Sequence, residues 1–169
     1  MRNIPIGGDT VNSQISREFG VGDNEAEDMK RRHGFIALGG SFEEPESNLA
    51  STISKIARNV MTRLHGEVSR SINVWRSQHG GSKPERLLLS GGGSTMMYVP
   101  DFFQEKLRIP VEYLNTFPAI NIGPEVDRAA LQSVAPMIQE LIGLSIRHVV
   151  RCPLEIVLLP RSIRKQKEL

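Results

Sequence analysis

The hydrophobic residues near the start of the chain follow a helical period. Apolar side chains recur every four positions from Val11 to Phe19, after two glycines, and this predicts an amphipathic helix that ends at Gly20. A second helix is expected in "DNEAEDMKRRHG", with Asp23 or Asn24 as its cap and acidic residues in its first turns. A short strand is expected at 35–38.

The next segment, from 47 to 78, carries the longest periodic pattern in the sequence. Apolar residues return there every three or four positions, which predicts one long amphipathic helix. They are Leu49, Ile53, Ile56, Val60, Leu64, Val68, Ile72 and Trp75.

A short apolar run, 87–90, then predicts a strand buried on both faces, since it lies between a charged stretch and a glycine cluster. A helix in "YVPDFFQEKL" and a strand at 111–114 would complete a βαβ-like unit. We expect a short helix with Pro124 in its first turn. A last helix should be capped by Ser133, carry Pro136 in its first turn, be largely buried and flank the sheet together with the 9–19 helix.

The glycines after the first strand are the clearest candidate for chemistry. Gly91, Gly92 and Gly93 remove every side chain where the backbone leaves the sheet, so a ligand could approach it closely. The spacing fits neither a P-loop, which needs a following Lys and Ser/Thr, nor the dinucleotide fingerprint, which would need glycine at Met96. A tight turn with no ligand is the structural alternative.

Composition narrows the possible classes of protein. The 169 residues are 39% hydrophobic, enough for one core, and contain a single cysteine, Cys152. Because the sequence has neither a long apolar span nor a signal-peptide core, we expect a cytosolic protein. The net charge is +2, and no aromatic residues are interleaved with the basic ones, which argues against nucleic-acid binding. The four histidines are too far apart in sequence for a metal site: His33, His65, His79 and His148.

Three segments in this order resemble a known family. "IPIGGDTVNSQIS" with "NEAEDMKRRHG", then "LLLSGGGSTMMYVPDFFQEKLRIPVEYLNTF", then "IQELIGLSIRHV" resemble the second half of the actin-like ATP-binding proteins. The type IV pilus assembly PilM family is the nearest match, and the cell-division FtsA family is second. The resemblance covers 4–159 and implies an α/β, actin-like (RNase H-like) second domain with a smaller helical subdomain.

The resemblance also assigns roles to individual residues. It implies that Gly91, Gly92 and Gly93 form the adenosine-binding turn, with Ser94 and Met97 beside it. Glu27 and Lys30 match the family positions that reach the ribose and the adenine edge, although an ordinary solvated ion pair is the alternative. Gly7 and Gly8 match the turn that enters the nucleotide cleft ahead of a helix N-terminus, a placement that favours anions.

Other family features are missing from the sequence. The two glycine/aspartate hairpins that hold the β- and γ-phosphates in this family have no counterpart here, so we expect the chain to be part of a longer protein. Met1 would then not be its natural start. ATP and magnesium are expected in the full-length parent, with weak or no binding by this chain. The expected division is 1–22 and 83–151 in one subdomain, 23–82 in a helical subdomain, and 152–169 as an extended segment with a basic tail.

The function implied by the resemblance is a cytoplasmic scaffold of a type IV pilus or type II secretion-like platform. It would lie at the inner face of the membrane through partners such as a PilN-like protein, and an open sheet edge would allow homo-oligomers. An FtsA-like division protein is one alternative, but the tail lacks the apolar residues of a membrane helix. An ATPase or sugar kinase is another, with Asp9 and Asp101 as its only candidate acids. We expect no enzyme activity from this chain.

The end of the sequence resembles a partner's docking peptide. PilN-like proteins dock on PilM through an Asn-Leu-Leu-Pro-type segment, and "LEIVLLP" resembles it with Val157 in place of asparagine. We therefore expect this segment to bind an actin-like domain, in its own chain or a neighbouring one, unless it is simply a terminal strand of its own domain. Its candidate contact residues are Ile156, Leu158, Leu159 and Pro160.

Overall fold

A computed structural model describes residues 2–37 and 47–149 as helices around a small parallel sheet. The first three helices are α1 (Gly8–Phe19), α2 (Asp23–His33) and the long α3 (Asn48–Gln78). Strand β1 (Leu87–Leu89), the 3-10 turn η1 (Gly92–Thr95), α4 (Val99–Leu107) and β2 (Val111–Tyr113) follow. The chain continues through η2 (Phe117–Ala119), α5 (Arg128–Val134), η3 (Ala135–Met137), α6 (Gln139–Ser145) and η4 (Ile146–His148).

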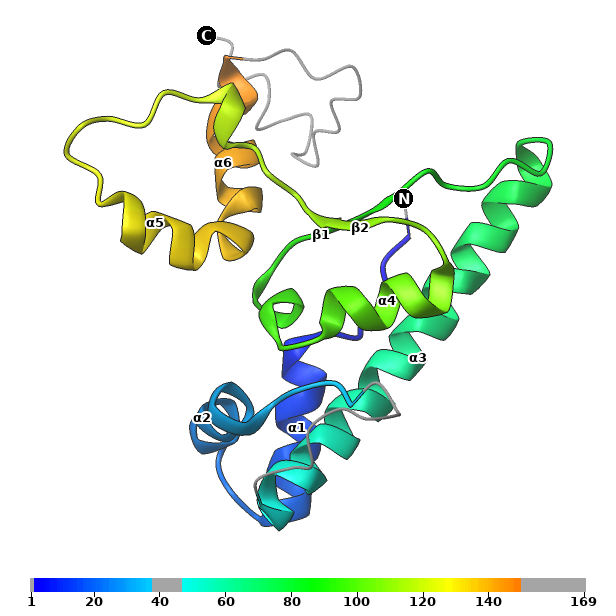
Figure 1. The fold of residues 1–169 in the computed structure, drawn as a ribbon, viewed down its shortest axis with the longest axis vertical. Coiled ribbons are helices and arrows are strands. Elements are labelled where there is room, and N and C mark those ends of the chain that lie inside the picture. The colour runs from blue at the N-terminus through cyan, green and yellow to red at the C-terminus, as the bar shows by residue number, and fades with distance from the viewer. Residues whose placement is uncertain (1, 38–46, 150–169) are drawn as a thin grey trace, which may run out of the picture.

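The core lies where α1, α2, α3 and α4 meet (Figure 1). Phe102 and Phe103 of α4 pack edge to face, with ring centroids 5.4 Å apart, and both are nearly fully buried. Val11 and Ile15, which formed the predicted apolar stripe of α1, are completely buried. α1 packs on α2 and α3, so its main neighbours are helices rather than the sheet.

The first helices match their sequence patterns closely. α1 ends at Gly20, whose left-handed φ of 66° suits glycine, and α3 begins after Ser47, whose side chain accepts a hydrogen bond from the backbone N–H of Ala50. The predicted caps of α2, Asp23 or Asn24, were wrong by one or two residues, because the helix begins at Asp23 after Gly22 and no side chain caps it.

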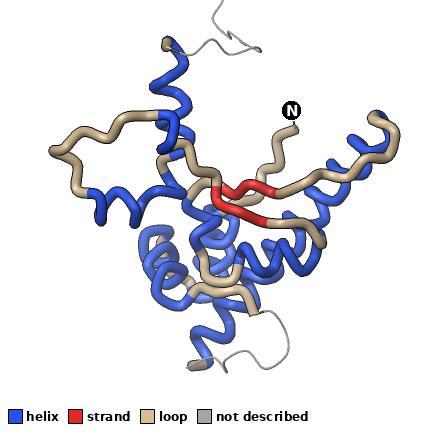
Figure 2. Tube along the Cα trace, turned by 45° about the horizontal axis from the view of Figure 1, so that its top comes forward, coloured by secondary structure: helices blue, strands red, loops and turns tan. Residues whose placement is uncertain are grey.

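The sheet is small in the described part of the chain, and its two strands are parallel, with Leu87 opposite Val111 and Leu89 opposite Tyr113 (Figure 2). Leu87 and Leu89 pack on the core, whereas Leu88 is 46% exposed, so the prediction that both faces are buried was wrong. The strand expected at 35–38 is reduced to a single parallel bridge between Phe35 and Met97, and Leu38 lies outside the described residues.

The end of the fold differs most from the sequence prediction. Pro124 lies in a turn, and α5 begins only at Arg128, after an Asp127 cap. The expected last helix is divided: Ser133 lies inside α5, Pro136 lies in η3, and α6 starts at Gln139.

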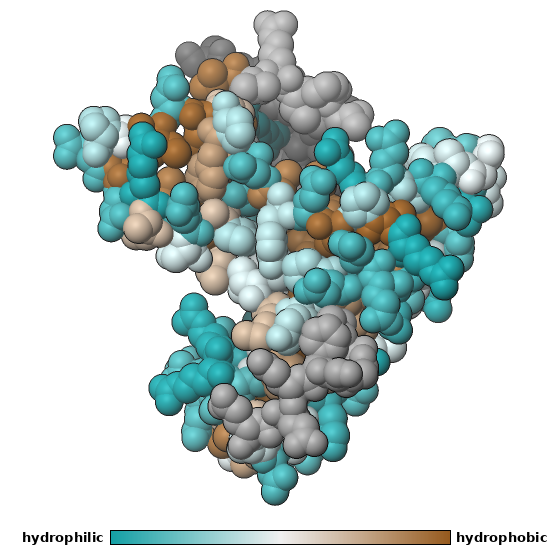
Figure 3. All heavy atoms as spheres, viewed as in Figure 1, coloured by the Kyte–Doolittle hydropathy of each residue, from teal (hydrophilic) through white to brown (hydrophobic). Residues whose placement is uncertain are grey.

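The expectation that the last helix is largely buried was also wrong. Leu141 and Leu144 of α6 are 64% and 62% exposed, and apolar atoms are visible over α5 and α6 at the upper left of Figure 3. Ile142 and Ile146, on the other side of the helix, are half-buried. A helix that is apolar on both sides, as this one is, keeps one side uncovered when it packs against a single neighbouring surface.

Truncation of Phe102 should test the position of the core. Phe102→Ala removes a side chain that is 1% exposed and touches α3 and α4, so the free energy of unfolding should fall by about 3 to 5 kcal/mol. Urea denaturation measures this change. Leu141→Ala, at an exposed position, should change it by less than about 0.5 kcal/mol, and equal losses for the two variants would contradict this placement of the core.

Candidate functional site

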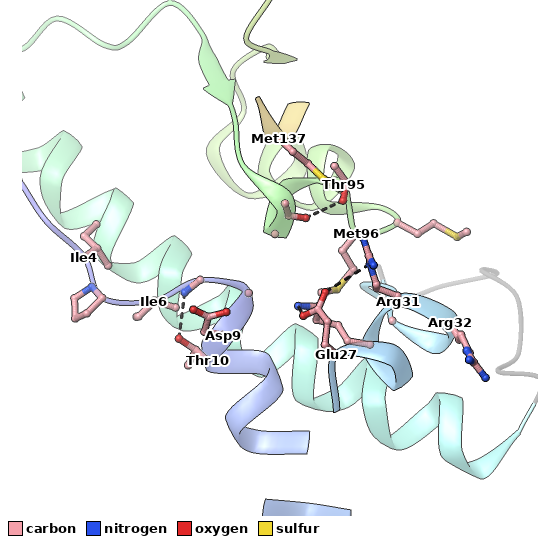
Figure 4. A pocket seen from close by; sticks show the side chains of 18 residues that line it. Ile4, Ile6, Asp9, Thr10, Glu27, Arg31, Arg32, Thr95, Met96 and Met137 are labelled. Atoms are coloured by element: carbon pink, nitrogen blue, oxygen red, sulfur yellow. Dashed lines mark hydrogen bonds and ion pairs between the residues drawn. The ribbon is translucent and has the colours of Figure 1, made fainter. Parts of the chain in front are cut away.

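One large pocket lies where three separate segments of the chain come together. Its volume is about 910 Å³, within the range of ligand pockets. Its walls come from the N-terminus of α1 with the preceding residues, from α2, and from the turn that includes η1 (Figure 4). Met137 of η3 adds a fourth contribution from late in the sequence.

The backbones of α1 and η1 approach each other at Gly8 and Gly93. A Cβ on Gly93 would lie 3.2 Å from the Gly8 nitrogen, and a Cβ on Gly8 would lie 3.8 Å from the Gly93 Cα. A side chain at Gly93 would therefore press directly on the backbone at the start of α1. These two glycines allow residues 85 positions apart in sequence to close the base of one pocket, which explains their use here without reference to any ligand.

The first turn of α1 presents backbone N–H groups at this pocket. Gly7, Gly8, Asp9 and Thr10 all line it, and the first turn of a helix has N–H groups without intrahelical partners. The Gly7 N–H donates to the Thr10 hydroxyl at 3.1 Å, which fixes the entry of the chain into the helix. The positive end of the α1 dipole therefore faces the pocket and favours an anionic ligand.

Helix α2 supplies the charged wall. Glu27 forms an ion pair with Lys30 and accepts a hydrogen bond of 2.7 Å from the Asn12 amide of α1. Arg31 lies 3.7 Å from the second oxygen of the same carboxylate. The Lys30 side chain is only 11% exposed, and its ammonium lies close to Gly8, beside the N-terminus of α1.

This arrangement affects how readily Glu27 binds a proton. Burial alone would raise the pKa of Glu27, but the hydrogen bonds from Lys30 and Asn12 and the charges of Lys30 and Arg31 outweigh burial and lower the pKa below its ordinary value. The carboxylate is thus held ionised at neutral pH. Lys30, Arg31 and Arg32 together exceed Asp9 and Glu27 by one positive charge among the lining residues.

The glycine turn itself is held from outside the pocket. Gly91 has a φ of 88°, a conformation that favours glycine, and its N–H donates to the Pro136 carbonyl at 2.8 Å. The Ser94 hydroxyl donates to the Gly91 carbonyl at 2.7 Å, and the Tyr113 hydroxyl donates to the Ser94 carbonyl at 3.0 Å. Burial, with a smaller contribution from the charge of Asp101, raises the pKa of Tyr113 and so keeps this donor protonated.

Most of the candidate residues predicted from the sequence surround this pocket. Seven of them line it: Gly7, Gly8, Glu27, Lys30, Gly92, Gly93 and Met97. Gly91 and Ser94 do not, because they hold the turn from behind. The four candidate residues of the tail, Ile156, Leu158, Leu159 and Pro160, lie outside the described residues.

The sequence did not indicate several other residues at this site. Arg31 follows Glu27 by four positions on a helix, a spacing that could have identified it. Asn12, Thr95 and Met137 join the site or its supports only through the folded arrangement, and no local pattern marks them. Met96 is 8% exposed and faces both the core and the pocket.

Two negative findings concern the described residues alone. Residues 2–37 and 47–149 contain no group of three His, Cys, Asp or Glu side chains placed to hold a metal ion. Within the same ranges, no helix is long and apolar enough to cross a membrane.

The lowered pKa of Glu27 makes a prediction about stability. A carboxyl group whose pKa is lower in the folded protein stabilises the fold above its unfolded pKa of about 4.3, and this contribution is lost as the pH falls through the folded pKa. Glu27→Gln should therefore flatten the acid side of a plot of unfolding free energy against pH. Urea denaturation at a series of pH values gives this plot. Glu25→Gln, in the same helix but outside the cluster, should leave the slope unchanged, and parallel curves for wild type and Glu27→Gln would refute the prediction.

Comparisons with known proteins come from three sources. The family model described as "Type IV pilus assembly protein PilM" matches residues 1–149. A solved structure titled "PilM-PilN type IV pilus biogenesis complex" superposes with a TM-score of 0.71 at 25% sequence identity. The likeness covers 88% of this chain and 39% of that chain, so this chain spans well under half the length of that relative. Comparison with curated proteins gives no match.

The family match agrees with the resemblance found in the sequence. It includes every helix and strand of the described structure and both sides of the pocket. The solved relative adds that the arrangement of helices around a small sheet is also similar. This chain belongs to the PilM family of type IV pilus assembly proteins.

Proposed function

We propose that this chain is the nucleotide-binding second half of an actin-like scaffold protein of a type IV pilus or type II secretion-like assembly platform. The observation that carries the proposal is the meeting of three elements at one pocket: the α1 N-terminus, the Glu27/Lys30 pair and the glycine turn at 92–93. These are the same three elements that the resemblance to actin-like proteins assigns to the adenosine half of an ATP site.

The pocket fits such a ligand in shape and charge. The open space beside Gly92, where a Cβ would meet nothing within 4 Å, leaves room for a flat ring and a sugar against the backbone, while the Glu27 carboxylate can accept hydrogen bonds from ribose hydroxyls. The N-terminus of α1, with the Lys30 ammonium close to it, gives the pocket positive charge that would favour a phosphate group. Bound ATP would bring its own magnesium ion, held chiefly by the phosphates and by residues of the full-length parent.

The positions of the acidic residues favour a scaffold role for this chain over an enzymatic one. Asp9 is exposed at the pocket and follows the start of α1, where an acidic side chain favours the helix dipole. Asp101 lies in the first turn of α4 and does not line the pocket. Glu27, the other acid that lines the pocket, is bound to Lys30 and Asn12, which makes it a poor general base, so we favour the binding role.

The same proposal includes the place of the protein in the cell and its partner. The solved relative is titled a complex of PilM with PilN. We place the parent protein in the cytoplasm, at the inner face of the membrane, where a PilN-like protein would hold it. An FtsA-like role in cell division has no specific observation in its favour here.

The nucleotide proposal predicts weak binding by this chain and a defined effect of mutation. Half a site should give at best millimolar affinity for ATP, which corresponds to about 4 kcal/mol. In the full-length parent, Lys30→Ala or Glu27→Ala should weaken ATP binding about tenfold, the effect of losing about 1.4 kcal/mol. Calorimetric titration measures both.

A matched control for these variants is Lys106→Ala on α4, outside the pocket, which should bind ATP as wild type does. Circular dichroism should confirm that each variant keeps its fold. Low-micromolar ATP binding by the isolated chain would overturn the half-site proposal, and unchanged affinity in both pocket variants of the parent would exclude this pocket as the nucleotide site.

The tail proposal makes a separate prediction. A peptide of residues 154–169 should be retained by the immobilised full-length parent, because several aliphatic side chains before Pro160 can fill an apolar groove or join a sheet edge. Leu158→Asp with Leu159→Asp in the same peptide should abolish retention, since charged side chains cannot be buried there. Equal retention of the two peptides, or none of either, would leave the segment as a terminal strand or arm of its own domain.

A further inference from the structure

The solvent side of α3 has an unusual distribution of charge. The helix contains five cationic residues and a single acidic one, Glu67. The five are Lys55, Arg58, Arg63, Arg70 and Arg76. Exposed helices normally mix both signs, because carboxylates next to ammonium and guanidinium groups add i,i+4 stabilisation. An excess of four positive charges on one helix, in a chain whose net charge is only +2, therefore calls for a specific explanation.

The cations share the face of α3 opposite to the core. Residues 53, 57 and 60 point inward and are fully buried, whereas Lys55 and Arg63 are exposed and Arg58 is half-buried. With 3.6 residues per turn, positions 55, 59, 62, 66, 70 and 73 follow one line along the outside of the helix. We call this line, with the flanking Arg58, Arg63 and Arg76, the basic ridge.

The neutral residues of the basic ridge are small. Asn59, Thr62, Gly66 and Asn73 stand between the cations, and all four are exposed. Lys55, Arg58 and Arg63 have no ion pair with any other described residue, and Glu67 is turned toward the flank, where it holds Arg2 and Arg70. Among the described residues, an anionic surface could thus approach the part of α3 from Lys55 to Gly66 along this line without meeting a carboxylate.

We propose that the basic ridge of α3 contacts the anionic headgroups of a lipid membrane. A helix of 31 residues offers the cations of one face to a flat surface, where several of them can be neutralised together. The exposed Trp75 near the end of α3 is stacked on His79, and among the described residues no exposed aromatic side chain neighbours Lys55, Arg58 or Arg63 on the helix to stack on bases, which favours lipid phosphates over nucleic acid. Figure 3 shows hydrophilic atoms along the right-hand side of the molecule, where α3 runs. The inference agrees with the proposed location at the inner membrane face but does not depend on the nucleotide pocket.

Vesicle co-sedimentation of the full chain tests the contact. The protein should sediment with phosphatidylcholine vesicles that contain phosphatidylglycerol, remain in solution with phosphatidylcholine alone, and be released by added salt. The triple variant Lys55→Gln, Arg58→Gln, Arg63→Gln should lower the partition coefficient about a hundredfold, since each cation near an anionic surface contributes about 1 kcal/mol, or about fivefold. All three positions lie on the solvent side, so the variant should fold.

Two matched controls separate the ridge from general charge. Arg17→Gln, Lys106→Gln, Arg128→Gln removes three exposed charges elsewhere and should leave sedimentation within about threefold of wild type, the difference expected from long-range charge alone. The second control replaces the basic residues of the tail with glutamine, at 161, 164, 165 and 167, and should also retain most of the binding.

The following outcomes would contradict the proposal. Equal sedimentation with neutral vesicles, or loss of binding in the tail variant but not in the ridge variant, would overturn it. If the ridge variant loses affinity for a mixed-sequence DNA duplex while the wild type binds DNA more tightly than vesicles at the same salt concentration, the partner is a nucleic acid and the membrane assignment is wrong.

Discussion

The close approach of Gly8 and Gly93 is the contact on which the pocket depends. It joins the start of α1 to the turn after β1, two segments that no local hydrogen-bond pattern would bring together. Once these backbones touch, α2 is placed beside them, because it packs on α1 and its Glu27 accepts a hydrogen bond from Asn12. The helical part and the sheet part of the chain thus meet where side chains are smallest, and the space left above them is the pocket.

Unfavourable electrostatic interactions are also found in the pocket. A lysine ammonium near the positive end of a helix dipole is unfavourable, and Lys30 is held there mainly by the ionised Glu27. An anion that enters the pocket would relieve this repulsion by interacting with both the ammonium and the N–H groups of α1. The lowered pKa of Glu27 and the position of Lys30 are therefore two parts of one arrangement, in which the carboxylate offsets the charge of the ammonium.

The sequence could predict those elements whose cause is local. α1, α3, α4 and both strands follow from local patterns of apolar residues, and Gly20 ends α1 as predicted. The division of the last helix was not predicted. Gln139, at the start of α6, is 2% exposed, and its side-chain amide joins Thr116 to Ala135. A long-range polar contact of this kind leaves no periodic trace.

At the candidate site, too, only the features with a local cause could be predicted from the sequence. The glycines and the i,i+3 ion pair could be recognised in the sequence, and the resemblance to actin-like proteins assigned them to the same nucleotide site. The supports could not be predicted, since the Pro136 carbonyl and the Tyr113 hydroxyl bind the glycine turn from 45 and 19 residues away in sequence. The pocket and the basic ridge lie on different sides of α3. α1 and α2 cover the apolar side of this helix, and the ridge lies on the other side. A layer of buried side chains therefore stands between the two surfaces, so a ligand in the pocket and a membrane at the ridge would not compete for space.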